Sequence, residues 1–290
     1  MRAVHHGATV RTVNLRIVRA WVNGRLLEDP HAPAIEVSDH GLTVGDGVFE
    51  AIKVVEGRPF ALTRHLNRLA RSAASLGLPE PDDALIRSAV AEVLAQDDMS
   101  LGRLRITYTG GPAELGSGRG DVTPTTVVVV DMLRPAPETT AAVRVPWPRN
   151  ERGAMAGVKS TSYAENVVAL AEAAKSGASE AIFANLAGNL CEGTGTNVGY
   201  VVGGEVRTPS LGSGCLAGIT RGLLLEWGDM VEVDEPITVL DSADEIFLMS
   251  TTRDVQGVHR IDGRELTAPG PLTRALIELW SAKEAEHWDP

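Results

Sequence analysis

The chain has 290 residues, an ordinary apolar and charged content, and a net charge of −11 at pH 7; its length predicts two domains. The negative charge argues against nucleic acid or an anionic membrane surface as a partner, and no apolar run is long enough for a membrane span. Two cysteines, Cys191 and Cys215, are too few for a disulfide framework, so a reducing, cytoplasmic compartment is expected.

The first half of the chain predicts a smaller α+β domain at residues 17–134, preceded by a flexible extension of residues 1–16. Alternating apolar residues at 17–22 are followed by Asn23-Gly24, a pair typical of a hairpin turn. Similar patterns predict further strands at 35–37, 48–55, 101–109 and 125–132, and helices at 63–76, with Thr63 as the cap, and at 82–95.

A glycine-rich loop, residues 110–120, separates the last two of these strands and is longer than a hairpin requires, which suggests a binding loop. Its Arg119 is expected either to meet an anion or to lie in a flexible surface loop. Residues 135–137, which contain two prolines, predict a linker. The second, larger α+β domain is therefore expected at residues 138–290.

The second half of the chain predicts another mixture of helices and strands. Its strands are expected at 142–145, 180–184, 198–202, 205–208, 231–233 and 245–249, and its helices at 162–176, 218–227, 239–243 and 272–286. In the first of these helices, the residues expected to face inward are Val167, Leu170, Ala171 and Ala174. Because helices and strands do not alternate strictly, the pattern predicts an α+β fold with two layers per domain.

Lys159 is one of only four lysines, and it stands between an irregular run, residues 150–157, and the helical pattern that begins at Ser162. A lysine amine forms a Schiff base with a carbonyl cofactor when its surroundings lower its pKa. On spacing alone, a solvated loop lysine is the simpler interpretation.

Two further features favour a reactive lysine. Glu192 stands in a turn, where it is either a solvated carboxylate or the partner of a protonated heterocyclic nitrogen. Gly218-Ile219-Thr220 opens a helix after a glycine-rich loop, and the free N–H groups of such a helix end form an anion site. A Schiff-base lysine, a pyridinium partner and a phosphate cup are together what pyridoxal phosphate (PLP) requires of a protein.

Other familiar kinds of site are excluded because their sequence motifs do not occur. Val158 stands where a phosphate-binding P-loop requires glycine before the lysine, and no Gly-x-Gly-x-x-Gly opens a helix after the first strand. No His-Glu-x-x-His or paired Cys-x-x-Cys occurs, so no metal site is expected. No Gly-x-Ser-x-Gly indicates a hydrolase.

The spacing of five motifs resembles the class IV (fold-type IV) PLP-dependent aminotransferases, from about residue 18 to the C-terminus. In chain order these motifs are Arg68, Lys159, Glu192-Gly193, Gly218-Ile219-Thr220-Arg221 and Ser250-Thr251-Thr252. The family includes branched-chain aminotransferases, D-amino-acid aminotransferases and aminodeoxychorismate lyases. The resemblance implies two α+β domains with PLP between them, and a homodimer in which the partner contributes a loop to each site.

The resemblance also implies a role for each matching residue. Lys159 forms the Schiff base with PLP and then moves the proton between substrate and cofactor. Glu192 pairs with the pyridine nitrogen, and Tyr163 lies near the position of a tyrosine that binds the cofactor O3′. The phosphate contacts are expected from Arg68, from the backbone of Gly218, Ile219 and Thr220, and from the Thr251 hydroxyl.

The resemblance leaves the reaction open between two branches. Residues 45–50 resemble the D-amino-acid and lyase branches, residues 116–120 resemble the lyase, and residues 250–252 resemble the aminotransferases. An aminotransferase acting on an amino acid and a 2-keto acid is favoured. The alternatives are a lyase that converts 4-amino-4-deoxychorismate to 4-aminobenzoate and pyruvate, and a non-catalytic PLP-binding protein. Substrate contacts are expected from Val44, Arg105, Arg119 and Thr252.

Overall fold

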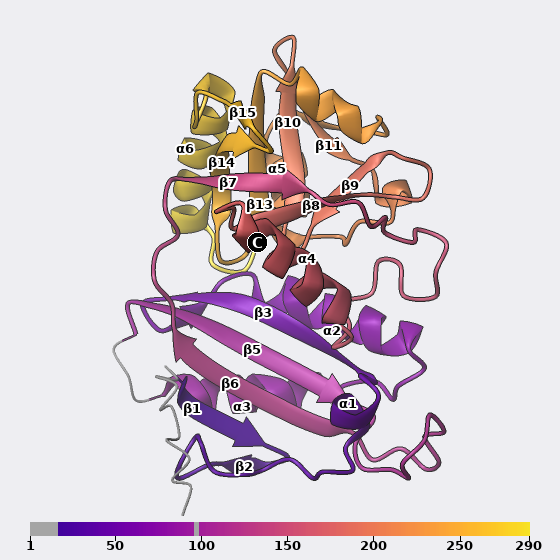
Figure 1. Ribbon diagram of the computed structural model, residues 1–290. Coiled ribbons are helices and arrows are strands. Elements are labelled where there is room, and N and C mark those ends of the chain that lie inside the picture. Colours follow the sequence, from indigo (N-terminus) through magenta and orange to yellow (C-terminus); the bar gives the residue numbers. More distant parts are fainter. Residues whose placement is uncertain (1–16, 96–98) are drawn as a thin grey trace, which may run out of the picture.

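The computed structural model describes residues 17–95 and 99–290; the predicted extension at residues 1–16 lies outside the described residues. Two β-sheets, each with its own helices, follow one another along the chain (Figure 1). Strands β1 to β6 form the first sheet and strands β7 to β15 form the second. The predicted α+β class is confirmed.

The first sheet has six antiparallel strands in the order β2-β1-β6-β5-β3-β4. Helices α2 and α3 pack against it and close its apolar core. The bounds are β1 Ile17–Val22, β2 Arg25–Leu26, β3 Gly47–Val55, β4 Arg58–Pro59, β5 Leu101–Thr109, β6 Thr125–Met132, α1 His40–Thr43, α2 Leu62–Ser75 and α3 Asp83–Leu94.

Two predictions in this half are wrong. Residues 35–37 form no strand, and Ile35 and Val37 are exposed rather than paired in the sheet. Helix α2 begins at Leu62, and Thr63 does not cap it. Asp289, close to the C-terminus, accepts the Thr63 N–H at 2.8 Å instead. A carboxylate that is distant in sequence thus supplies the acceptor that a local cap would have provided.

The second sheet is mixed, in the order β12-β11-β10-β13-β14-β7-β8-β9, with β15 paired to β14. Its strands are β7 Thr139–Arg144, β8 Glu180–Ala184, β9 Leu190–Gly193, β10 Asn197–Val202, β11 Glu205–Pro209, β12 Met230–Val233, β13 Glu245–Ser250, β14 Asp254–Ile261 and β15 Arg264–Glu265. Its helices are α4 Ala164–Lys175, α5 Ile219–Trp227 and α6 Pro271–Glu286, with 3-10 turns η1 Leu211–Ser213 and η2 Ile237–Asp241. Within residues 17–95 and 99–290, no helix combines the length and apolar character needed to cross a bilayer.

Helix α4 presents the opposite face from the one predicted. Val167 and Leu170 are 65% and 42% exposed, and the other two residues expected inside are exposed as well. The buried residues are Ala169 and Ala173, which belong to an apolar cluster with Phe183 of β8. Small side chains allow the helix to lie close to the sheet, so the larger residues point away from it.

A long segment between β7 and α4 returns from the second sheet to the first. The N–H of Phe49 donates to the Lys159 carbonyl at 3.0 Å, and the N–H of Thr161 donates to the Gly47 carbonyl at 2.8 Å. Residues 159–161 therefore run along β3 as an added strand-like segment. This pairing places Lys159 where the two sheets meet.

A buried lysine also joins the two halves of the chain. Lys53 of β3 forms an ion pair with Asp254 of β14 at 2.6 Å and another with Glu284 of α6. Its ammonium lies 5.9 Å from the ring centroids of Phe60 and Trp280. A buried charge requires such partners, so these contacts hold β3 against the second sheet beside Ala51, which lines the cavity described next.

Candidate active site

A cavity of about 360 Å³ opens between the two sheets, and it brings together most of the residues predicted to form the site. Its walls come from β3 and α2 of the first half, from the Lys159 segment, and from three turns of the second half. The predicted residues that line it are Arg68, Lys159, Tyr163, Glu192, Gly218, Ile219, Thr220, Thr251 and Thr252. Val44, Arg105 and Arg119 do not line it.

The Lys159 amine lies beside two aromatic side chains in the cavity. Its Nζ lies 4.5 Å from the ring centroid of Phe49 and 6.0 Å from that of Tyr163. Burial and the nearby charge of Arg68 lower the pKa of Lys159 to about 8. About a tenth of the amine is therefore neutral, and thus nucleophilic, at pH 7, far more than for an ordinary lysine.

Arg68 is held by a carboxylate that the sequence patterns did not single out. Glu50 of β3 is fully buried and accepts hydrogen bonds from Arg68 Nε at 2.8 Å and Nη2 at 2.6 Å. His65 Nδ1 lies 2.7 Å from the same carboxylate. Burial by itself raises the pKa of Glu50, but the charge and hydrogen bonds of Arg68 outweigh it and bring that pKa to about 2. Glu50 is thus an anion that orients the guanidinium.

Arg68 also connects α2 with the start of α5. Its Nη1 donates to the carbonyl of Ala217 at 2.8 Å. The next residue, Gly218, is the N-cap of α5 and offers no side-chain acceptor, so the N–H groups of the first helical turn are free to bind an anion. A Cβ on Gly218 would lie 1.9 Å from Asn197 Oδ1, which explains why glycine stands there.

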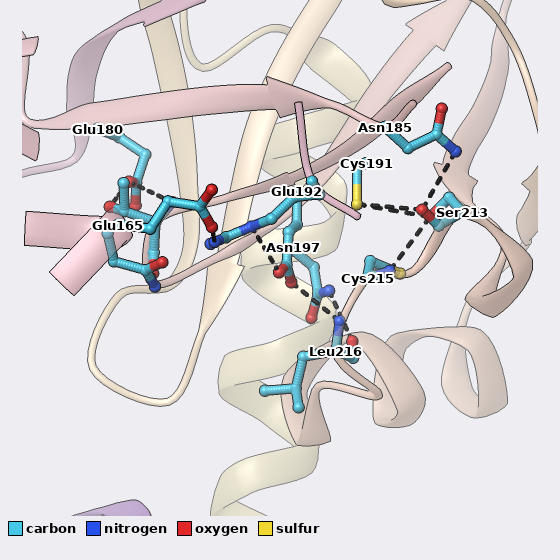
Figure 2. Close-up of polar contacts among 12 residues, drawn as sticks. Glu165, Glu180, Asn185, Cys191, Glu192, Asn197, Ser213, Cys215 and Leu216 are labelled. Carbon is cyan, nitrogen blue, oxygen red and sulfur yellow. Dashed lines mark hydrogen bonds and ion pairs between the residues drawn. The ribbon is translucent and has the colours of Figure 1, made fainter. Parts of the chain in front are cut away.

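Glu192 of β9 is held from two sides (Figure 2). Its Oε2 accepts the Leu216 N–H at 2.9 Å, and its Oε1 lies 3.4 Å from Arg149 Nε. Burial raises the pKa of Glu192, and the Arg149 charge and the Leu216 N–H oppose that rise. The carboxylate is thus fixed in orientation with a cation beside it.

Arg149 was not anticipated from the sequence. Its guanidinium stacks on Phe183 at 4.0 Å from the ring centroid, and its Nη1 donates to Glu165 at 2.7 Å. It lies ten positions before Lys159, at an isolated β-bridge with Asn185. Nothing in the local pattern indicates its partner, because Glu192 belongs to a strand far along the chain.

Tyr163 packs edge-on against Phe49, with ring centroids 5.1 Å apart. Burial and the negative charge of Glu192 raise the pKa of Tyr163 to about 12. Its hydroxyl therefore remains protonated at neutral pH and is available to donate a hydrogen bond in the cavity.

The remaining candidates lie outside the cavity walls. Arg119 forms two hydrogen bonds with the carboxylate of Asp46, each 2.6 Å long, so the anion that it meets is a protein side chain. Arg105 is exposed as a residue, and its guanidinium lies 3.8 Å from the ring centroid of Phe49. Val44 is exposed immediately after α1.

Comparison with known proteins identifies a family and two differently named relatives. The family model for amino-transferase class IV matches residues 47–261. A putative branched-chain-amino-acid aminotransferase of Methanocaldococcus jannaschii is 31% identical, over 90% of this chain and 94% of its own. A bifunctional aminodeoxychorismate lyase / D-amino acid transaminase of Mycobacterium tuberculosis is 30% identical, over 90% and 96%.

Solved structures agree with the fold. The fold IV transaminase CpuTA1 of Curtobacterium pusillum superposes with a TM-score of 0.79 at 34% identity, covering 89% of this chain and 93% of its own. A hypothetical aminotransferase of Mycobacterium tuberculosis in its PLP-bound form gives 0.81 at 28% identity, covering 91% and 98%. These values cover nearly all of both chains, so the likeness extends over both sheets.

Proposed function

The chain belongs to the class IV aminotransferase family, and from this we propose that its cavity holds PLP and moves an amino group between an amino acid and a 2-keto acid. The observation that carries the proposal is the meeting of Lys159, Glu192 and the start of α5 in one cavity. Each comes from a different segment of the chain, and each supplies a different requirement of the cofactor.

The residues present fit PLP by their chemistry. The free N–H groups at Ile219 and Thr220, the Thr251 hydroxyl and the Arg68 guanidinium form a donor set suited to a phosphate. Glu192 would hold a protonated ring nitrogen, because burial raises the pKa of its carboxyl group and a ring cation would join Arg149 in favouring the ionised form. Within this arrangement, Lys159 is the amine that would meet the cofactor aldehyde.

PLP, when bound, supplies an electron-withdrawing ring that stabilises negative charge at the substrate α-carbon. Lys159 Nζ accepts the α-proton and returns it during the transfer, and its lowered pKa suits a base that works near neutral pH. The Tyr163 hydroxyl, which stays protonated, would be the donor to the cofactor O3′ that the family resemblance implies. Arg105 is our candidate for binding the substrate carboxylate, because its guanidinium lies 3.8 Å from the ring centroid of Phe49, the ring that Lys159 Nζ also contacts.

A second candidate function is the aminodeoxychorismate lyase reaction. It is favoured by the bifunctional relative from Mycobacterium tuberculosis and by the glycine-rich loop that carries Arg119. The ion pair between Arg119 and Asp46 weighs against it, because a substrate carboxylate would have to displace Asp46. We therefore rank amino-group transfer first.

The reaction is tested by an amino-donor screen of L- and D-amino acids with pyruvate or 2-oxoglutarate, run beside a lyase assay. We expect turnover to require both an amino donor and a keto-acid acceptor. In the lyase assay, the enzyme receives 4-amino-4-deoxychorismate and no keto acid. Pyruvate released there over many turnovers, without any transfer in the screen, would replace the first function by the second.

The pKa of Lys159 predicts how cofactor capture depends on pH. Only the neutral amine attacks an aldehyde, so the rate at which PLP joins the cofactor-free protein should rise about tenfold per pH unit below the pKa of about 8 and level off above it. Stopped-flow absorbance at a fixed PLP concentration measures this rate. A rate that stays constant across this pH range would show that proton loss from Lys159 does not control capture.

We further propose that the protein is a homodimer whose partner loop closes each cavity. Val37 and Leu115 are 84% and 87% exposed, and Leu42 and Val44 lie exposed on the same pair of loops. These loops adjoin, because His40 Nε2 lies 3.0 Å from the carbonyl oxygen of Glu114. Large apolar side chains exposed on adjoining segments favour a protein contact. A solution mass of twice 30.7 kDa would agree with this.

The chain division expected from the sequence is also retained as a proposal, with domains at 17–134 and 138–290 joined by residues 135–137. The separation of β1–β6 from β7–β15 supports it, and limited proteolysis within the linker would test it. A cytoplasmic location is proposed on the two free cysteines; fractionation of cells that produce the protein would test it.

A further inference from the structure

Glu180 is a buried carboxylate that none of the roles above uses. It is the first residue of β8, it is 1% exposed, and it does not line the cavity. Its Oε1 accepts the N–H of Thr194 at 2.8 Å and of Ala181 at 3.1 Å, together with the Thr194 hydroxyl. Its Oε2 accepts the Thr196 hydroxyl at 3.1 Å. A buried charge is costly unless it is satisfied in this way, so these donors are firmly placed.

The donors other than Ala181 belong to a turn that forms part of the cavity wall. Residues 193–197 line the cavity directly after Glu192, and the Gly193 N–H donates to the Thr196 carbonyl at 2.8 Å. A Cβ on Gly193 would lie 2.3 Å from Thr196 Oγ1 and 3.0 Å from Glu180 Cδ. The turn is thus packed directly onto the Glu180 carboxylate, which fixes the position of the turn.

The same turn connects back to Glu192. Its last residue, Asn197, donates from Nδ2 to the Leu216 carbonyl at 2.9 Å, and the Leu216 N–H is the donor to Glu192 Oε2. Figure 2 shows Glu180, Glu192, Asn197 and Leu216 along this path. A shift of the turn would therefore move both the backbone and the hydrogen-bond donor of Glu192.

A second turn in the cavity wall, between β13 and β14, also contacts Glu180. Arg253 follows Thr251 and Thr252 in the turn between β13 and β14, and its Nη2 lies 4.0 Å from Glu180 Oε2. The guanidinium also donates to the hydroxyl and the carbonyl of Ser179, each at 3.0 Å. Arg253 Nη1 also donates to Gln256 Oε1 at 2.6 Å, so the contact with Glu180 is the longest of several that hold the turn with the candidate phosphate hydroxyl of Thr251.

We propose that Glu180 is a positioning residue for the cofactor. Its carboxylate holds the 193–197 turn beside Glu192 and, through Arg253, the turn that carries Thr251. The inference rests on the proposed function, since it takes PLP as the occupant of the cavity. It assigns Glu180 no contact with the reacting atoms.

The test uses Glu180→Ala and Glu180→Gln, with Glu245→Ala as a matched control. Glu245 is also the first residue of a strand in the second sheet and is 7% exposed. It accepts the backbone N–H groups of Leu272 and Thr273 at the start of α6, away from the cavity. Each variant is titrated with PLP in its cofactor-free form by absorbance, and its melting temperature is measured in the same form.

We expect Glu180→Ala to raise the Kd for PLP by about tenfold or more, which corresponds to ~1.4 kcal/mol. Glu180→Gln should raise it by only about threefold, because its amide oxygen still accepts the Thr194 N–H. Glu245→Ala should lower the melting temperature but leave the Kd within about twofold of wild type. If Glu180→Ala does not fold, the glutamine variant decides, and a Kd equal to that of wild type overturns the proposal.

Two further outcomes separate this inference from the proposed function. If Glu180→Ala binds PLP as wild type does and only melts earlier, as Glu245→Ala is expected to do, Glu180 is merely structural and this inference is overturned alone. If the wild-type protein itself binds no PLP, the proposed function and this inference are overturned together.

Discussion

Replacing Lys159 by alanine lowers kcat for amino-group transfer by about 10³-fold or more, because the variant lacks both the amine that meets the cofactor and the base that moves the proton. Lys159 is the only lysine among the residues that line the cavity, so no other amine of the described chain takes its place. Steady-state rates with the best donor from the screen measure the loss. PLP added to the variant should also fail to give the visible absorbance of the lysine-bound cofactor.

The matched control is Lys175→Ala. Lys175 is an exposed lysine on α4, paired only with Glu172 at 2.6 Å, and removing such a surface pair changes little. We expect its rate to equal that of wild type. Full turnover by Lys159→Ala would contradict the catalytic assignment. A wild-type protein that binds PLP but transfers no amino group would instead revive the non-catalytic alternative.

Replacing Glu50 by glutamine should lower the free energy of unfolding by about 3–5 kcal/mol, the usual cost of leaving one charge of a buried pair without its partner. The unpaired charge is that of Arg68, because glutamine at position 50 can accept its hydrogen bonds but carries no negative charge. Arg68 should also lose its fixed orientation, so PLP affinity should fall. Urea unfolding of the cofactor-free protein measures the first effect, and a PLP titration measures the second.

The effect of this substitution should depend on pH in a defined direction. The pKa of Glu50 is about 2 in the folded protein against an ordinary value of 4.5. Its charge therefore stabilises the fold fully above about pH 4.5, and this contribution is lost as the pH falls toward 2. The stability difference between wild type and Glu50→Gln should be largest near neutral pH and shrink on acidification.

An exposed ion pair between α2 and α5 provides the control. Arg64 of α2 and Glu226 of α5 form a bidentate pair, with both hydrogen bonds 2.7 Å long, at the surface. Glu226→Gln should change the free energy of unfolding by no more than about 1 kcal/mol. If Glu50→Gln costs no more than Glu226→Gln, then burial does not make the Glu50 anion important.

Features that depend on neighbouring residues could be predicted from the sequence. Strand alternation and the Asn23-Gly24 turn predicted β1 and its hairpin, since both depend on residues adjacent in the chain. The glycine-rich start of α5 was predicted for the same reason. Lys159 and Glu192 were singled out because few residue types supply a reactive amine or a ring-nitrogen partner, and their order along the chain resembles that of one family.

Only the tertiary structure decided which partners surround these residues. The hydrophobic pattern of α4 allowed more than one inward face, and packing on Phe183 chose the alanine face. The pairing of Arg119 with Asp46 was likewise absent from the sequence patterns. Spacing cannot identify such pairs, because the two residues lie on segments whose approach depends on the whole fold.

The partners of the carboxylates around the site also depend on the whole fold. The sequence by itself determined that Lys159 could be reactive, since it is a lysine at an element junction in a chain with the family's motifs. It did not determine that Glu50 orients Arg68, that Arg149 accompanies Glu192, or that Glu180 lies beneath the 193–197 turn. A pKa and a hydrogen-bond geometry depend on burial and on neighbours brought together from distant segments, and these exist only once the two sheets have packed around the cavity.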